Sequence, residues 1–179
     1  MSGLVDCLRS AKQREDRATL AALRRGLGKP PGTAPEMYPH VVPYLPNHAG
    51  QWTEASHYLV AALFAAHPLD WTGEEPGWDS RNLGASMRRL QGPEASAGVE
   101  RRFVALLQTA PGDLANQLRH IVSLLAAESA PVDWNQLLID IQRWDREDRE
   151  VQRRWARAFW GARESREATG EEETTAAAE

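Results

Sequence analysis

The residue types that most often carry catalysis or bind metals are few and scattered in this chain. Its five histidines are residues 40, 48, 57, 67 and 120, and no two of them have the HExxH spacing of a zinc enzyme. With a single cysteine, Cys7, neither a cysteine-based zinc site nor an internal disulfide can form. There is no glycine-rich phosphate loop and no GxSxG nucleophile motif. These residues therefore form no recognisable catalytic motif, and no metal site and no cofactor are expected.

Arginine is the residue type whose number and spacing suggest a binding function. Of the 21 basic residues only Lys12 and Lys29 are lysines, and arginine provides a fixed charge, bidentate contacts to phosphate and stacking on bases. Helical spacing aligns four arginines as a stripe opposite the apolar residues 151, 155 and 159. The stripe consists of Arg146, Arg149, Arg153 and Arg157. The alternative is a solvated face, because Glu150 lies four residues after Arg146 and four before Arg154, where ion pairs form within one helix.

The charges of the chain are unevenly distributed. Residues 163–179 contain two basic and six acidic residues, which account for the net charge of −4 and leave a neutral body. Residues 31–80 contain no lysine or arginine. All basic residues of the body therefore lie in 1–30 and 81–162, so attraction to an anionic partner must come from a local cluster.

The composition is that of an ordinary soluble protein. In 179 residues, 42% are hydrophobic and 26% are charged, which is typical of one large domain or two small ones. The longest apolar stretch, residues 58–66, is too short to cross a bilayer, and the first residues do not have the pattern of a signal peptide. A cytoplasmic protein is expected.

Helical periodicity recurs along the chain, and no alternation typical of a strand persists. The clearest helices are expected within 113–160, where Asp133 is a candidate N-cap and Trp134, Trp144 and Trp155 occupy apolar faces. Further helices are expected at 4–27, 52–67, 83–90 and 100–107, and only short helical turns at 37–46, which contains three prolines.

These patterns predict an all-α protein made of two small helical lobes. The predicted lobes are residues 1–95 and 96–162, separated near 91–97, and residues 163–179 form a disordered acidic tail. Residues 69–79 are expected to form an exposed connector.

Several sequence blocks in a fixed order resemble a known family. The blocks are "LAALRRGLG" before "MYPHVVPYLP", then "NLGASMRRL", "ERRFVALL", "LRHIVSLLAAESAPVDWNQLLIDIQRW" and "VQRRWARAFW", and they cover roughly residues 17–160. Together they resemble the CasB family, the small subunit of the type I-E CRISPR surveillance complex, Cascade. The acidic tail and the connector "DWTGEEPGW" depart from the family pattern.

The resemblance implies a helical, non-catalytic protein that is present as two copies in the complex. It implies contacts with the other Cascade subunits, with the CRISPR RNA and with target DNA, whose displaced strand it would help to hold. The family blocks point to Arg24, Arg25, Arg88, Arg89, Arg101, Arg102, Arg119 and Arg143 as nucleic-acid-binding residues. The helical spacing adds Arg149, Arg153 and Arg157.

Two other classes of function remain open. One is a helical interaction subunit that does not bind nucleic acid, which the neutral body favours because stand-alone nucleic-acid binders are usually basic. The other is a small hydrolase or regulator with an unrecognised site, which a polar pocket with converging histidine and carboxylate groups would support.

Overall fold

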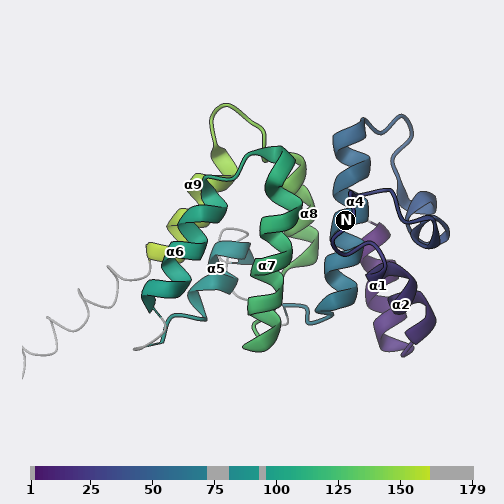
Figure 1. Ribbon diagram of the computed structural model, residues 1–179, viewed down its shortest axis with the longest axis horizontal. Helices are drawn as coiled ribbons and strands as arrows, with labels where there is room; N and C mark the ends of the chain where they lie inside the picture. The colour runs from purple at the N-terminus through teal and green to yellow at the C-terminus, as the bar shows by residue number, and fades with distance from the viewer. Residues whose placement is uncertain (1–2, 72–80, 93–95, 162–179) are drawn as a thin grey trace, which may run out of the picture.

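The computed structural model describes residues 3–71, 81–92 and 96–161, and every regular element in these ranges is helical, which confirms the all-α class. The first group of elements is α1 (Gly3–Gln13), α2 (Arg17–Arg24), η1 (Pro35–Met37), α3 (Tyr38–Val41), η2 (Val42–Tyr44) and α4 (Gln51–Ala66). The second group is α5 (Leu83–Arg88), α6 (Ser96–Leu107), η4 (Pro111–Asp113), α7 (Leu114–Ala127), α8 (Trp134–Gln142) and α9 (Glu150–Trp160). The two groups lie side by side (Figure 1).

The N-terminal region contains two helices, so the prediction of one helix over 4–27 is wrong. Glu15, between α1 and α2, adopts a left-handed conformation with φ of 53°, which interrupts a right-handed helix. The carboxylate of Asp16 then begins α2 by accepting a hydrogen bond from the backbone N–H of Thr19 at 3.0 Å. Residues 12–17 are all polar and include neither proline nor glycine, so the sequence has no strong helix-breaking signal at this point.

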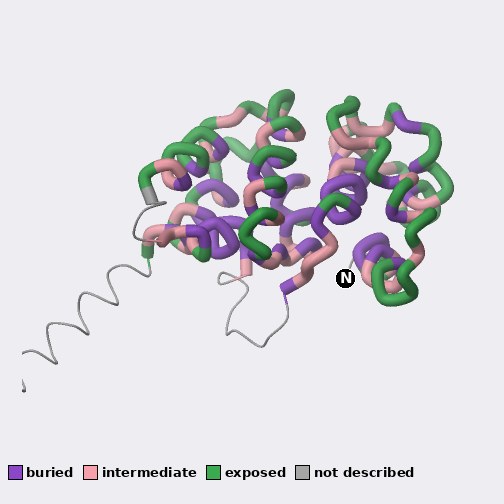
Figure 2. Tube along the Cα trace, turned by 60° about the horizontal axis from the view of Figure 1, so that its bottom comes forward, coloured by how far each residue is buried: buried purple, intermediate pink, exposed green. Residues whose placement is uncertain are grey.

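Helix α4 lies at the centre of the molecule. It is buried on almost every side along residues 56–65, and Figure 2 shows such buried stretches, in purple, in the interior of both groups. Helices α1 and α2 pack against it within the first group, and α7 and α8 pack against it from the second. The helix expected at 52–67 is therefore confirmed, and its central place follows from its composition, since an apolar run with no polar face has to be covered all round.

Tryptophan side chains form much of the core of the second group. Trp134, Trp144 and Trp155 are almost completely buried, as predicted. Trp134 begins α8 directly after Asp133, whose carboxylate accepts a hydrogen bond from the backbone N–H of Gln136 at 2.9 Å. The predicted N-cap at Asp133 is therefore confirmed.

A short extended contact joins the two groups. We call residues 67–71, which follow α4, and residues 130–134, which precede and begin α8, the latch. Asp70 and Val132 form an isolated parallel bridge there. Its hydrogen bonds run from the Trp71 N–H to the Val132 carbonyl (3.3 Å), from the Val132 N–H to the Leu69 carbonyl (3.2 Å), and from the Trp134 indole to the Leu69 carbonyl (3.2 Å). The ring of His67 also contacts the Ala130 carbonyl at 2.7 Å.

Helix α5 packs more closely against α9 than against any other helix. A Cβ atom at Gly84 would overlap the backbone carbonyl of Trp155, so glycine is what permits this close crossing. Helix α5 precedes the expected division at residue 95, and α9 follows it; the division itself stays a prediction. Residues 69–71 of the expected connector belong to the latch, where Trp71 is buried, so the expected exposure is wrong for that residue. Residues 72–79 of the connector, residues 93–95 and the expected acidic tail lie outside the described residues.

Candidate nucleic-acid interface

Three of the arginines predicted to bind nucleic acid hold the end of a neighbouring helix. Arg24 donates a hydrogen bond from Nε to the Ala65 carbonyl of α4 at 2.6 Å. Arg88 donates to the Ala158 carbonyl of α9 at 2.8 Å, and Arg149 donates to the Leu107 carbonyl of α6. The last carbonyls of a helix have no partner within it and carry partial negative charge, so a guanidinium satisfies and stabilises them. These three side chains therefore have a structural role.

Two more of the predicted arginines have side-chain partners. Arg25 forms an ion pair with Glu36 at 3.1 Å, although its side chain is 64% exposed. The guanidinium of Arg89 lies over the ring of Trp71, 4.2 Å from the ring centroid, as a cation–π contact. Both side chains keep their positive charge at the surface, and each contact fixes the orientation of the guanidinium group.

The other six predicted arginines are exposed, and among the described residues none of their side chains makes a hydrogen bond or an ion pair. They are Arg101, Arg102, Arg119, Arg143, Arg153 and Arg157. An exposed guanidinium without an internal partner keeps all of its donors available to a phosphate. The six are therefore the candidates for binding that the structure leaves available.

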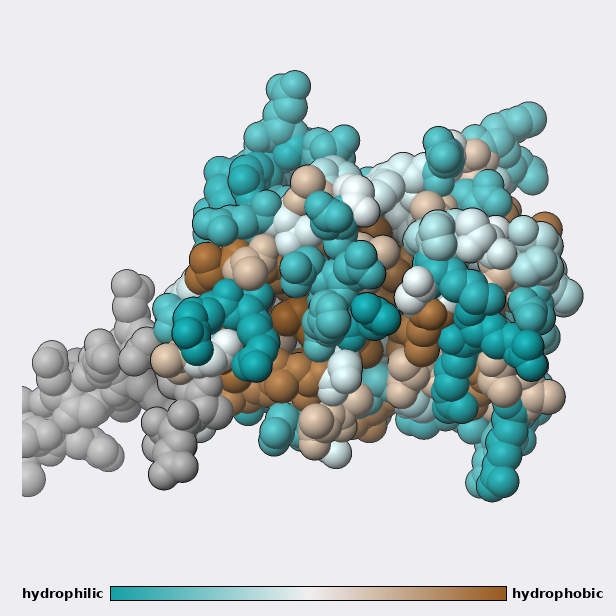
Figure 3. Space-filling view, viewed as in Figure 1, coloured by the Kyte–Doolittle hydropathy of each residue, from teal (hydrophilic) through white to brown (hydrophobic). Residues whose placement is uncertain are grey.

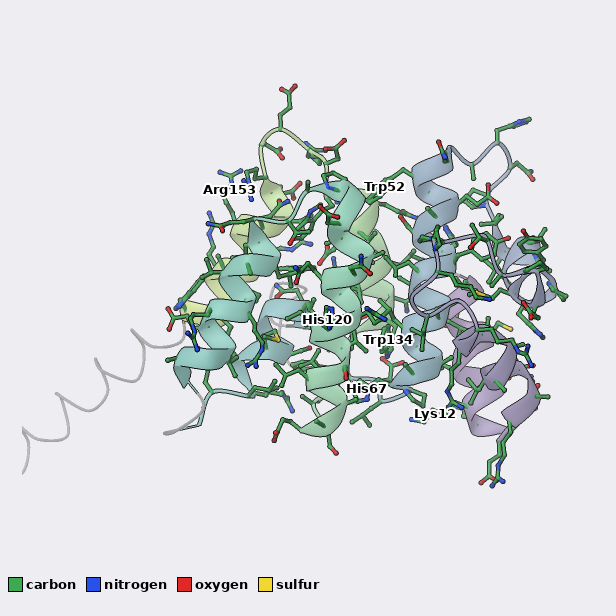
Figure 4. The ribbon with its side chains drawn as sticks, in the orientation of Figure 1. Lys12, Trp52, His67, His120, Trp134 and Arg153 are labelled. Carbon is green, nitrogen blue, oxygen red and sulfur yellow. The ribbon has the colours of Figure 1, made fainter. Side chains whose placement is uncertain are left out.

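Four of these six lie on two neighbouring helices, Arg101 and Arg102 on α6 and Arg153 and Arg157 on α9. Helices α6 and α9 run in opposite directions, because Arg149 at the start of α9 bonds to the last residue of α6, while the Trp160 indole at the end of α9 donates to Glu100 at 3.2 Å. Aromatic rings fill the space between the helices: Phe103 stacks on Phe159 with centroids 4.3 Å apart. We call the exposed faces of this pair, with Arg101 on α6 and Arg153 and Arg157 on α9, the α6–α9 surface. Figure 4 shows Arg153 at the outer edge of the molecule.

The predicted arginine stripe is shorter than its spacing suggested. Helix α9 begins at Glu150, so Arg146 and Arg149 precede it, and Arg149 adopts a left-handed conformation with φ of 50°. Arg146 pairs with Asp148 at 3.0 Å and with Glu150 at 3.8 Å. The solvated alternative is therefore correct for Arg146, and the placement of Arg149 on the helix face is wrong. Only Arg153 and Arg157 of the stripe lie on the exposed face of α9.

The other available arginines lie away from the α6–α9 surface. Arg102 lines an open groove between α6 and α7, together with Gln117 and His120 of α7. The face that carries these helices is mostly hydrophilic, with hydrophobic residues visible between the helices (Figure 3). Arg119 lies on α7 against the loop at Gly28, and Arg143 caps α8. The eleven predicted arginines thus do not form one continuous patch.

A buried charged cluster escaped the sequence analysis. Asp140 of α8 is completely buried and pairs with Arg154 of α9, which is 5% exposed. The carboxylate of Asp140 also accepts hydrogen bonds from the Trp155 indole at 2.6 Å and from the Gln136 amide at 2.7 Å. Burial raises the pKa of Asp140, and the charge of Arg154 and the donated hydrogen bonds counteract part of that rise. Asp140 precedes Ile141 and lies on the apolar face of its helix, and this position could have indicated a buried carboxylate.

The described histidines do not converge on a reactive centre. His57 contacts the Thr53 carbonyl one turn earlier at 2.7 Å, and His67 belongs to the latch, beside Trp134 (Figure 4). Within residues 3–71, 81–92 and 96–161, no three histidine, cysteine, aspartate or glutamate side chains are grouped closely enough to hold a metal ion. Nor does any helix in these ranges combine the length and apolar character needed to cross a membrane.

Comparison of the sequence with known families identifies its class. The family model of the CRISPR-associated protein Cse2 matches residues 19–160. A CRISPR-associated protein Cse2 from Thermus thermophilus is 37% identical over 155 residues, which cover 84% of this chain and 83% of the relative. The chain therefore belongs to the CRISPR-associated protein Cse2 family.

Solved structures agree with this assignment. CasB from Thermus thermophilus superposes with a TM-score of 0.73 at 34% identity, over 90% of this chain and 99% of that chain. A chain of a CRISPR RNA-guided surveillance complex has the same fold, with a TM-score of 0.72 at 23% identity over 93% of this chain and 99% of that chain. The resemblance to CasB drawn from the sequence blocks is confirmed.

Proposed function

We propose that this chain is the small, non-catalytic subunit of a type I-E CRISPR RNA-guided surveillance complex, present there in two copies. In this role it contacts the other protein subunits and lies beside the CRISPR RNA and the target DNA. It binds the displaced DNA strand and so stabilises the opened target. Family membership and the fold shared with a chain of such a complex support the place in the assembly.

The proposed binding of nucleic acid rests on the α6–α9 surface. Arg101, Arg153 and Arg157 are exposed on packed helices, and no ion pair within the described residues neutralises them. Their helices are fixed by the aromatic contacts between Phe103, Phe159 and Trp160. Arginines on a rigid support can bind a phosphate backbone without reading its bases, which suits a strand whose sequence differs from target to target.

A few such contacts are sufficient because strand exchange is nearly balanced. The RNA–DNA hybrid that forms is about as stable as the DNA duplex that opens, with stacking of about 1.4 kcal/mol per step on both sides. Holding the displaced strand therefore shifts the equilibrium towards the open target. If all six available arginines contact phosphates of one strand, the logarithm of the binding constant falls with the logarithm of salt concentration at a slope of about −4, from roughly −0.7 per contact.

The test compares two triple variants in the reconstituted complex. Arg101→Ala, Arg153→Ala and Arg157→Ala together remove the α6–α9 surface. The control, Lys12→Ala, Arg14→Ala and Arg17→Ala, removes the same charge from exposed positions on α1, α2 and the turn between them. We expect both complexes to assemble, and only the first to bind duplex target more weakly, with a salt slope shallower by about 2. Equal target binding and equal salt slopes for the two variants would contradict the nucleic-acid role.

A specific observation favours a second function, that of an interaction subunit without direct nucleic-acid contact. Arg24, Arg88 and Arg149 are engaged within the fold, and the body of the chain is neutral. In that case the α6–α9 surface would contact acidic residues of another subunit. The same triple variant would then fail to enter the complex, which gel filtration detects before any DNA is added.

A further inference from the structure

The acidic segment 163–179 has no part in the proposed function, yet it carries the opposite charge to the surface beside which it begins. It contains six glutamates and two arginines, and three of the glutamates are consecutive, Glu171 to Glu173. It follows Gly161, whose N–H donates to the Arg157 carbonyl at 2.8 Å at the end of α9. The most acidic part of the chain is thus tethered to the helix that carries Arg153 and Arg157.

The distances allow the glutamates of segment 163–179 to reach the arginines of the α6–α9 surface. Arg157 lies four residues before Gly161 and Arg153 eight, so the more distant arginine is about 12 Å from the tether along the helix. The Trp160 indole bonds to Glu100, which places α6, with Arg101, next to the same end of α9. Glu171 lies ten residues after Gly161, and a chain of that length can extend to about 35 Å at most. The three glutamates are therefore held within reach of the whole α6–α9 surface.

The acidic residues that surround the surface have other partners. Glu100 accepts the bond from Trp160, and Asp148 pairs with Arg146 at 3.0 Å. Glu150 lies 3.8 Å from Arg146 and 3.9 Å from Arg154. Asp148 also acts on Arg153 through its charge, but none of these carboxylates forms an ion pair with Arg101, Arg153 or Arg157, whose side chains can therefore bind an anion from another part of the chain. A tethered anionic segment is present at an effective concentration of about millimolar, although each exposed ion pair is weak.

We propose that segment 163–179 binds in cis to the α6–α9 surface and occupies it until nucleic-acid phosphates displace it. The glutamates then act as a weak competitor that reduces binding to arbitrary nucleic acid. A strand presented at high local concentration, as in an opened target, outcompetes them. The competition rests on the proposed function, whereas the contact between the segment and the surface does not.

The experiment changes the segment and measures contact and competition separately. The variant is Glu171→Gln, Glu172→Gln and Glu173→Gln, and the matched control is Glu15→Gln, Glu54→Gln and Glu128→Gln, three exposed glutamates elsewhere. NMR of the arginine side-chain Nε–H signals reports contact, and fluorescence anisotropy with a labelled single-stranded oligonucleotide reports affinity. We expect only the segment variant to shift the signals of Arg153 and Arg157, independently of protein concentration. We also expect it to bind the oligonucleotide about 2- to 10-fold more tightly at roughly 50 mM salt, with the gain shrinking as salt screens the contact.

The outcomes distinguish this proposal from the proposed function. Unchanged arginine signals in the segment variant would overturn it, as would shifts that grow with protein concentration, which indicate contact between molecules. A gain in affinity that persists after Arg153→Ala and Arg157→Ala would also overturn it, because the segment would then act through net charge alone. Shifted signals in a protein that binds no nucleic acid would contradict the proposed function and leave the contact in cis supported.

Discussion

Arginines in this protein have two different tasks. Arg24, Arg88 and Arg149 each donate to a carbonyl in the last turn of another helix, where they satisfy groups that the helix leaves unpaired. The side chains of Arg153 and Arg157 are exposed on α9 and make no hydrogen bond or ion pair with the described residues. Sequence patterns did not separate these tasks, because spacing along one helix contains no information about which neighbouring helix ends nearby.

This division predicts opposite effects of alanine substitution on stability and on binding. Arg153→Ala and Arg157→Ala should each change the free energy of unfolding by less than about 0.5 kcal/mol and weaken target binding by the complex. Arg88→Ala should cost roughly 1–3 kcal/mol, because it removes a charge-assisted hydrogen bond to the end of α9. Urea unfolding and target titration of the same variants check both effects. A loss of stability in Arg153→Ala as large as that in Arg88→Ala would show that the exposed arginine is structural.

The buried pair of Asp140 and Arg154 gives a second prediction at the scale of single residues. Asp140→Ala should cost about 3–5 kcal/mol, since it leaves the guanidinium of Arg154 buried without its carboxylate. Replacing both partners, as Asp140→Leu with Arg154→Met, should cost less than Asp140→Ala alone, because no buried charge then remains. Thermal melts of the two variants provide the comparison. If the double variant were the less stable of the two, the loss would come from the packing of the new side chains and not from an unpaired buried charge.

At the scale of elements, the close crossing of α5 and α9 depends on one glycine. Gly84→Ala places a methyl group where the Trp155 carbonyl lies, so the helices have to move apart, at a cost of roughly 1–3 kcal/mol. Gly92→Ala is the control, because a Cβ atom there has no neighbour within 4 Å. Chemical denaturation should show a loss only for Gly84→Ala. Equal stability of both variants would mean that α5 adjusts its position freely.

Helix positions were largely predictable from the sequence, and helix ends were less so. Apolar periodicity located α4, α7 and α8 because each has a continuous buried face of large side chains, such as Leu118 or Trp134. It failed at Glu15 and at Arg149, where one left-handed residue interrupts the helical path within a polar stretch that contains neither proline nor glycine. A non-glycine residue with positive φ leaves little trace in composition.

At the scale of the whole molecule, the predicted division at residue 95 has a direct test in fragments. If residues 96–162 form a lobe of their own, that fragment should fold cooperatively in isolation. A fragment of residues 81–161 retains α5, which packs against α9. Circular dichroism melts of both fragments make the comparison. A cooperative transition in the longer fragment alone would move the boundary to before α5.

The candidate site was only partly predictable because it is a property of the assembled molecule. Arg101 and Arg153 are about fifty residues apart in sequence, and the packing of Phe103 on Phe159 brings their helices together. The family blocks pointed to the arginines of α6, and helical spacing pointed to those of α9. Which guanidinium groups remain available after folding depends on contacts between elements, such as the bond from Arg88 to α9.

The latch also determines when the first group of helices can be completed during synthesis. The indole of Trp134 bonds to Leu69, which precedes it by 65 residues, and closing so long a loop requires all of the intervening chain. A ribosome that adds about 5–20 residues per second produces those residues in roughly 3–13 s. For that interval α4 has emerged without α8, and its apolar side facing the second group has no cover. The nascent chain should therefore be most vulnerable to proteases and most dependent on chaperones between the synthesis of Leu69 and that of Trp134.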